Sequence, residues 1–131
     1  MPFILWNPGL SAGGRSSDQV GGLCDLGATV CDVIGVPPAP AWQGRSLLDP
    51  NHPPRTYFAA ANDGYLLAIR QDRWKYILNA TAGKQELYDL SSDPIEQINV
   101  AGEQREVTRE LRQRVGAWMA SQRERYRGLQ R

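Results

Sequence analysis

Apolar and polar positions alternate through the middle of the chain, as in strands of a sheet with one better-buried face. Trp74, Tyr76 and Leu78, for example, alternate with Lys75 and Ile77, which are expected on the other face. Turn-forming residues interrupt the alternation at Asn62–Gly64 and at Gln71–Asp72, as they do in hairpins. The pattern predicts a meander of four antiparallel strands at Thr56–Ala61, Tyr65–Arg70, Arg73–Asn79 and Glu86–Leu90.

Two other segments carry apolar residues at helical spacing. The first spans residues 25–34, with Asp25 as the predicted N-cap and Gly35 as the residue that ends the helix. The second spans residues 103–127, and its apolar stripe is predicted to cover the strands. The stripes consist of Leu26, Val30, Val33 and Ile34 in the first helix, and of Val107, Leu111, Val115, Trp118 and Met119 in the second.

The N-terminal third has a different organisation. The apolar run Phe3–Trp6, ended by Asn7–Gly9, is predicted to be a parallel strand buried on both faces, and the Gly- and Ser-rich stretch Ser11–Ser17 a loop. Six prolines fall within residues 36–55, which therefore form an extended connection. We expect an α+β chain whose two parts are residues 1–48 and residues 49–131.

Charge and length exclude some classes of protein. The 131 residues suit a small protein, and 15 Lys and Arg against 14 Asp and Glu create no global field that favours nucleic acid or an anionic membrane. No stretch approaches the roughly 20 apolar residues of a membrane span. The segment Met1–Trp6 lacks the basic region of a secretory signal. If the chain is a fragment of a longer protein, this absence says nothing about secretion, so the localisation stays open.

Candidate chemical residues are few, and each has a structural alternative. His52 is the only histidine and could be a general base or a ligand, but its Pro-rich surroundings favour an exposed loop residue. Asp89, Asp93 and Glu96 could bind a cation. Turn capping and a salt bridge are favoured for them, because Asp-Pro sequences form such turns. The thiols of Cys24 and Cys31 lie about two helical turns apart, too far for a disulfide; both are expected to be free and buried.

The basic residues also have a structural alternative to a functional role. Arg73 and Lys75 could face an anionic substrate, but strand alternation favours the solvated side of the sheet. The last segment could bind nucleic acid, yet its arginines are mixed with acids and lie off the apolar stripe, which favours a solvated helix face. These arginines are Arg105, Arg109, Arg112, Arg114, Arg123, Arg125, Arg127 and Arg131.

The order of several motifs resembles one known family. Glu86–Asn99 reads ELYDLSSDPIEQIN and follows the RWKYI sequence of Arg73–Ile77. The pair resembles the closing segment of the sulfatase family, in which a WKY strand precedes an LYDL, DP, E and N motif. Three upstream segments are also similar to sulfatase segments in the same order: Pro2–Gly9, Asp25–Val36 (with Ala28 in place of the usual proline) and Gln43–Leu48.

The resemblance implies a fold and a reaction. The sulfatase fold is an α/β sandwich related to alkaline phosphatase, followed by a small subdomain with a four-stranded antiparallel sheet packed against a C-terminal helix. Residues 1–48 would supply the last strand and helix of the α/β domain, and residues 49–131 the subdomain. Members hydrolyse sulfate esters with a formylglycine nucleophile made in a C/S-x-P-x-R motif and with a divalent cation, usually calcium; Lys and His assist at the leaving oxygen.

None of these chemical groups can be assigned to a residue here. Neither Cys24 nor Cys31 begins a C-x-P-x-R motif, and no paired Asp-Asp cluster is available for a metal. We therefore assign no catalytic, cofactor-binding or metal-binding residue, and expect calcium only in the full-length protein. The expected partner is an N-terminal catalytic region, with a sulfate ester as substrate of the whole; neither nucleic acid nor a membrane is expected. The interpretation is a sulfatase C-terminal fragment, inactive alone. The alternatives are a phosphatase or phosphonate-ester hydrolase fragment of the same superfamily, or a stand-alone interaction module.

Overall fold

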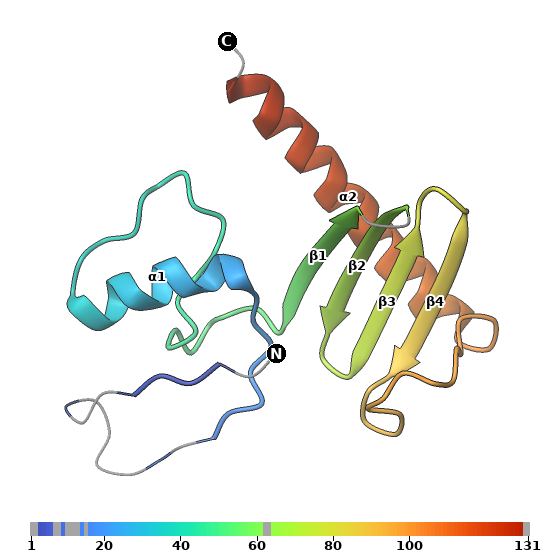
Figure 1. Ribbon diagram of the computed structural model, residues 1–131, viewed down its shortest axis with the longest axis horizontal. Helices are drawn as coiled ribbons and strands as arrows, with labels where there is room; N and C mark the ends of the chain where they lie inside the picture. Colours follow the sequence, from blue (N-terminus) through green and yellow to red (C-terminus); the bar gives the residue numbers. More distant parts are fainter. Residues whose placement is uncertain (1–2, 7–8, 10–13, 15, 62–63, 130–131) are drawn as a thin grey trace.

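The protein has an α+β architecture, as the pattern predicts. The computed structural model describes residues 3–6, 9, 14, 16–61 and 64–129. A four-stranded sheet packs on the long helix α2 (Arg105–Leu129), and the shorter helix α1 (Leu23–Ile34) lies beside the sheet (Figure 1). The predicted turn at Asn7–Pro8, most of the Ser11–Ser17 loop and the Asn62–Asp63 connection lie outside the described residues.

The sheet is the predicted antiparallel meander. Its strands are neighbours in space in the same order as in the chain, because short connections join each strand to the next. The fourth strand begins two residues earlier than predicted and ends one residue earlier. The strands are β1 (Arg55–Ala61), β2 (Tyr65–Gln71), β3 (Trp74–Asn79) and β4 (Lys84–Asp89).

The core lies between one face of this sheet and α2. One row of register partners crosses all four strands, and its last three members have no exposed surface. Leu111 and Val115 of α2 pack on this row, and the ring of Trp118 stacks on Tyr57 with centroids 5.0 Å apart. The predicted apolar stripe of α2 therefore covers the sheet. The row consists of Tyr57, Ile69, Tyr76 and Leu87.

The outer edge of β4 is closed by the last residue of the ELYDLSSDPIEQIN motif. The side-chain oxygen of Asn99 accepts hydrogen bonds from the backbone amides of Leu87 and Ala101, both at 3.0 Å. Its Nδ2 donates to the carbonyl of Gln85 at 3.3 Å, and the amide of Val100 donates to the carbonyl of Leu87 at 2.9 Å. These bonds satisfy backbone groups that a bare edge strand would leave unpaired.

Helix α1 begins earlier than predicted. Gly22, rather than Asp25, is the N-cap, and the Asp25 carboxylate accepts the amide of Gly22 at 2.8 Å from the third helical position. The prediction of Asp25 as N-cap is wrong because a glycine is required one turn earlier. A Cβ at position 22 would lie 2.4 Å from the Oγ1 of Thr56 in β1. The predicted end is confirmed, since Gly35 has the left-handed φ of 73°.

Phe3–Trp6 does not form the predicted strand. These residues have no regular secondary structure, and their side chains are exposed, from 41% for Leu5 to 85% for Ile4. A parallel strand buried on both faces requires neighbouring strands and covering helices. The sheet of the described residues consists of β1 to β4 and does not include this segment.

Candidate functional site

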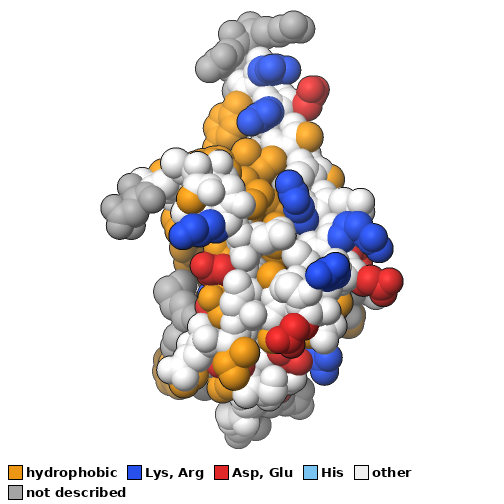
Figure 2. Space-filling view, turned by 90° about the vertical axis from the view of Figure 1, so that its right-hand side faces the viewer, with side chains coloured by type: hydrophobic (Ala, Val, Ile, Leu, Met, Phe, Trp, Pro, Cys, Tyr) orange, Lys and Arg blue, Asp and Glu red, His pale blue; other side chains and the backbone are white. Residues whose placement is uncertain are grey.

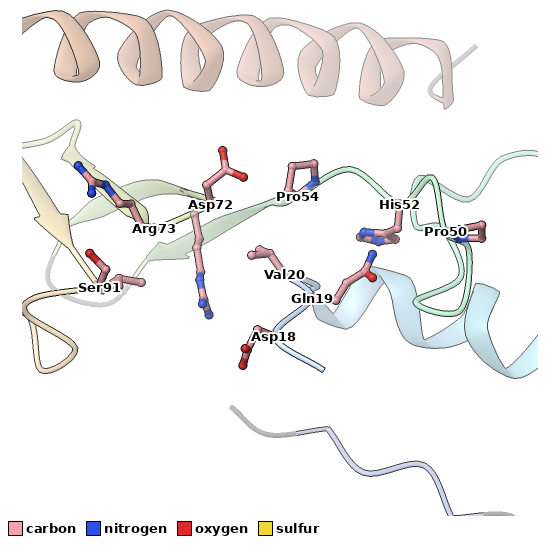
Figure 3. Close-up of a pocket in the computed structure, with 11 residues that line it drawn as sticks. Asp18, Gln19, Val20, Pro50, His52, Pro54, Asp72, Arg73 and Ser91 are labelled. Carbon is pink, nitrogen blue, oxygen red and sulfur yellow. The ribbon is translucent and has the colours of Figure 1, made fainter. Parts of the chain in front are cut away.

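A cleft of about 670 Å³ opens at the end of the sheet where β1 begins and β2 ends (Figure 3). Arg70 and Arg73 line it together with Asp18 and Asp72, so its walls carry both signs of charge. Figure 3 shows Arg73 and Ser91 at one end of the cleft and His52 at the other. We call it the His52 cleft.

The most enclosed polar group of this cleft is the His52 imidazole. Its Nδ1 lies 2.9 Å from the carbonyl oxygen of Pro53, and because a carbonyl only accepts, Nδ1 carries a proton. Its Nε2 has no hydrogen-bond partner in the part of the chain that the structure describes, and it lies 3.5 Å from an oxygen of the Asp25 carboxylate. That carboxylate also accepts the amide of Arg45 at 2.9 Å. Through the Arg45 amide, Asp25 therefore connects the start of α1 to the segment that leads into the sheet, and His52 packs beside it.

The prediction that His52 is an exposed loop residue is wrong, because only 7% of it is accessible. The loop folds back on itself. The amide of His52 donates to the carbonyl of Asp49 at 3.0 Å, and the amide of Arg55 donates to the carbonyl of Pro53 at 2.7 Å. The Asp-Pro-Asn sequence before His52 is a turn signal that could have indicated this reversal. Nothing in the sequence indicated that the turn packs against α1.

The two cysteines do not supply a nucleophile to the Asp25 and His52 side chains. Cys24 and Cys31 are free, as predicted, but Cys24 is exposed and Cys31 only partly buried, so the expected burial is wrong. The Sγ of Cys24 lies 3.8 Å from an oxygen of Asp25. Partial burial of the thiol, and then the charge of the Asp25 carboxylate, raise the pKa of Cys24. A raised pKa keeps the sulfur in its protonated, weakly nucleophilic form.

Three of the four carboxylates of the motif, those of Asp89, Asp93 and Glu96, are engaged at the turn after β4 and in a salt bridge. Asp93 accepts the backbone amides of Gln97 and Ile98 at 3.1 and 2.8 Å. Asp89 accepts both the amide and the hydroxyl of Ser91. Glu96 forms a salt bridge with Lys75. The predicted roles in turn capping and in a salt bridge are confirmed.

These contacts also bear on the divalent metal that the sulfatase resemblance implies. The carboxylates of the turn are already engaged by protein donors. No group of three or more His, Cys, Asp or Glu side chains within the described residues could hold a metal ion. The residues present do not fit such a site. The structure likewise contains, over its described part, no helix long and apolar enough to cross a bilayer.

Arg73 and Lys75 differ in exposure. The Arg73 side chain is 57% exposed, lies 4.8 Å over the Trp74 ring and is 3.5 Å from Asp89, consistent with the predicted solvated position. Lys75 is also on the face opposite the core, but its salt bridge with Glu96 leaves only 27% of its side chain exposed.

The polar and charged side chains that line the His52 cleft can bind a polar ligand. The described part contains no nucleophile paired with a base.

Comparison with known proteins places this geometry in context. No family profile matches the chain. Arylsulfatase K of Homo sapiens is 32% identical over 133 aligned positions, which cover 88% of this chain and 25% of that protein. The N-acetylgalactosamine-6-O-sulfatase of Bacteroides thetaiotaomicron is 38% identical over 80 positions, covering 50% of this chain and 16% of that protein.

Solved structures show the same fold. A 2-O GAG sulfatase superposes with a TM-score of 0.64 at 21% identity, covering 76% of this chain and 25% of that one. The phosphonate monoester hydrolase of Agrobacterium radiobacter superposes with a TM-score of 0.62 at 22% identity, covering 82% and 26%.

The chain belongs to the sulfatase family. It corresponds to a C-terminal portion of a sulfatase and spans about a quarter of the length of the curated relatives it matches. The predicted sulfatase subdomain, a four-stranded antiparallel sheet with a helix, is present. The phosphonate hydrolase structure shares the fold and does not favour the alternative reaction.

Proposed function

We propose that this chain is the C-terminal part of a sulfuric ester hydrolase whose catalytic groups lie in the region it does not span. The observation that carries this proposal is the coverage: 88% of the chain aligns with arylsulfatase K, but only 25% of that protein is matched. By the family resemblance, the nucleophile and the calcium ion would belong to the unmatched region. Sulfate-ester hydrolysis is then a property of the whole protein, and the chain alone is inactive.

We also propose that residues 1–48 belong to the α/β domain of that whole protein and residues 49–131 to its subdomain. Exposed apolar side chains support this division. Among the described residues, fifteen large hydrophobic residues are exposed, and ten of these lie before residue 49. Contact with water is unfavourable for so much apolar surface, which supports the proposal that another part of a sulfatase covers it. The ten are Phe3, Ile4, Leu5, Trp6, Leu23, Val30, Ile34, Val36, Trp42 and Leu48.

The test is to read the DNA upstream of the Met1 codon and to assay both products. A C/S-x-P-x-R motif in the same reading frame supports the proposal. The joined protein, coexpressed with a formylglycine-generating enzyme, is then expected to hydrolyse an aryl sulfate, while the 131-residue chain does not. Hydrolysis by the purified chain would refute its inactivity. An unrelated upstream gene would favour the stand-alone interaction module, and hydrolysis only of phosphonate or phosphate esters would favour the alternative enzyme class.

A further inference from the structure

A second cavity, of about 300 Å³, lies between α2 and the start of β4 and is lined by an unusual set of charges. Three arginines of α2 face it: Arg105, Arg109 and Arg112. Their spacing of four and three residues places them on one face of the helix. The other lining residues are Gln85, Ala101, Gly102 and Thr108, so no carboxylate lines the cavity. We call it the arginine groove.

The three guanidinium groups lack acidic partners within the described residues. Arg105 donates from Nε to the carbonyl of Gly102 at 3.1 Å, and neither the Arg109 side chain nor the Arg112 side chain has a hydrogen bond or an ion pair there. The nearby Glu110 is engaged by Arg114 at 2.8 Å. Basic side chains recur along the face of the molecule in Figure 2, some of them beside acids. The arginine groove differs because its lining is basic only.

One residue that lines the groove, Gln85, is hydrogen-bonded to the core. The Tyr76 side chain is fully buried, and its hydroxyl donates to the side-chain oxygen of Gln85 at 3.3 Å. Burial raises the pKa of Tyr76, and the positive charge of Arg112 opposes that rise. The Arg112 side chain itself is exposed, so an anion can reach it from solvent.

We infer that the arginine groove binds a tetrahedral oxyanion, either free or as the sulfate or phosphate ester group of a larger molecule. Guanidinium groups match such oxygens with paired hydrogen bonds and stay charged at every physiological pH. Arg105 and Arg112 are about 10 Å apart along the helix axis, at 1.5 Å per residue. An anion between them would relieve the repulsion among three unpaired cations. The groove shares no residue with the His52 cleft, so this inference does not rest on the proposed reaction.

The test is an NMR titration of the full chain at constant ionic strength. Inorganic sulfate, inorganic phosphate and glucosamine 6-sulfate are the probes, with glucosamine as the control that lacks the sulfate group. Saturable shifts of the arginine Nε–H signals are expected with the three anions and not with glucosamine. Tighter binding of glucosamine 6-sulfate than of inorganic sulfate would identify the ester as the source, and the reverse order would identify the free ion.

Two double variants with equal loss of charge separate the groove from general electrostatics. R109A/R112A is expected to weaken binding by about tenfold or more, because it removes two of three charge-assisted contacts. R123A/R125A removes two exposed arginines of α2 that do not line the groove, and should leave binding within about twofold. R109K/R112K keeps the charge but loses the paired donors, so an intermediate loss is expected.

Two results would overturn the inference. One is that none of the three anions produces saturable shifts. The other is an equal weakening in the R109A/R112A and R123A/R125A variants, which would show that only net charge matters. All substituted residues are exposed, and an unchanged circular dichroism spectrum confirms that each variant is folded.

Discussion

Asn99→Ala tests whether the last residue of the ELYDLSSDPIEQIN segment stabilises the sheet edge. The substitution removes the oxygen that accepts the amides of Leu87 and Ala101, both at 3.0 Å. Leu87 is fully buried and Ala101 is 9% exposed, so water replaces this acceptor poorly. At a net 0.5 to 1.5 kcal/mol for each hydrogen bond, the free energy of unfolding should fall by about 2 kcal/mol.

Asn99→Asp is the matched control. It keeps an acceptor oxygen in place, loses the 3.3 Å bond from Nδ2 to the carbonyl of Gln85 and sets a second oxygen against that carbonyl, so its loss should be smaller than that of Asn99→Ala. In urea unfolding followed by tryptophan fluorescence, a loss of about 2 kcal/mol lowers the midpoint by about 1 M at a slope near 2 kcal/mol per M. Hydrogen exchange should accelerate at the Leu87 amide of Asn99→Ala. Equal midpoints for the two variants, or unchanged exchange at Leu87, would refute the assigned role of Asn99.

Three further outcomes are expected. Gly44→Ala should destabilise the protein by more than 1 kcal/mol in urea unfolding, because its Cβ would lie 1.8 Å from the backbone oxygen of Cys24. As a control, Gly116→Ala should stabilise α2 by about 0.5 to 1 kcal/mol. Equal effects of the two substitutions would contradict the packing at position 44. Hydrogen bonding by the Ser91 hydroxyl lowers the pKa of Asp89 below 3.8, so its stabilising contribution is present above about pH 4 and is lost as the pH falls through the lowered pKa. In a carboxyl NMR titration, Ser91→Ala should raise the pKa of Asp89, and an unchanged value would exclude this cause. The isolated chain should self-associate or unfold over a broad range because of its exposed apolar surface, and a monomer that melts sharply in sedimentation and calorimetry would contradict this expectation.

The sheet and α2 were predictable because their determinants are local. Alternation in each strand, turn residues between strands and the 3.6-residue stripe of α2 all indicate the same packing. The roles of Asp89 and Asp93 followed from the same reasoning, since an Asp in a turn bonds to amides a few residues away.

The predictions that the structure contradicts concern features that depend on residues distant in the sequence. Asp25 is a good N-cap by residue type, but the contact of Gly22 with Thr56 of β1 determines where α1 begins. His52 is buried because its turn packs against α1, which no local pattern encodes. Phe3–Trp6 has the composition of a buried strand, yet a strand forms only where partners supply its hydrogen bonds. Both clefts combine residues from several elements, so their linings could not be predicted from spacing.

The consecutive order of the four strands has a consequence for the speed of folding. Each strand pairs only with its neighbours in sequence, with two residues between β2 and β3 and four between β3 and β4, and α2 follows the last strand. Contacts between residues close in the chain need little loop-closure entropy, so such topologies fold fast. Within a longer sulfatase, the sheet and α2 are therefore expected to reach their native pairing before the apolar surface of residues 3–48 finds its distant partners. That surface, and not the sheet, would then be the part that depends on chaperones during synthesis.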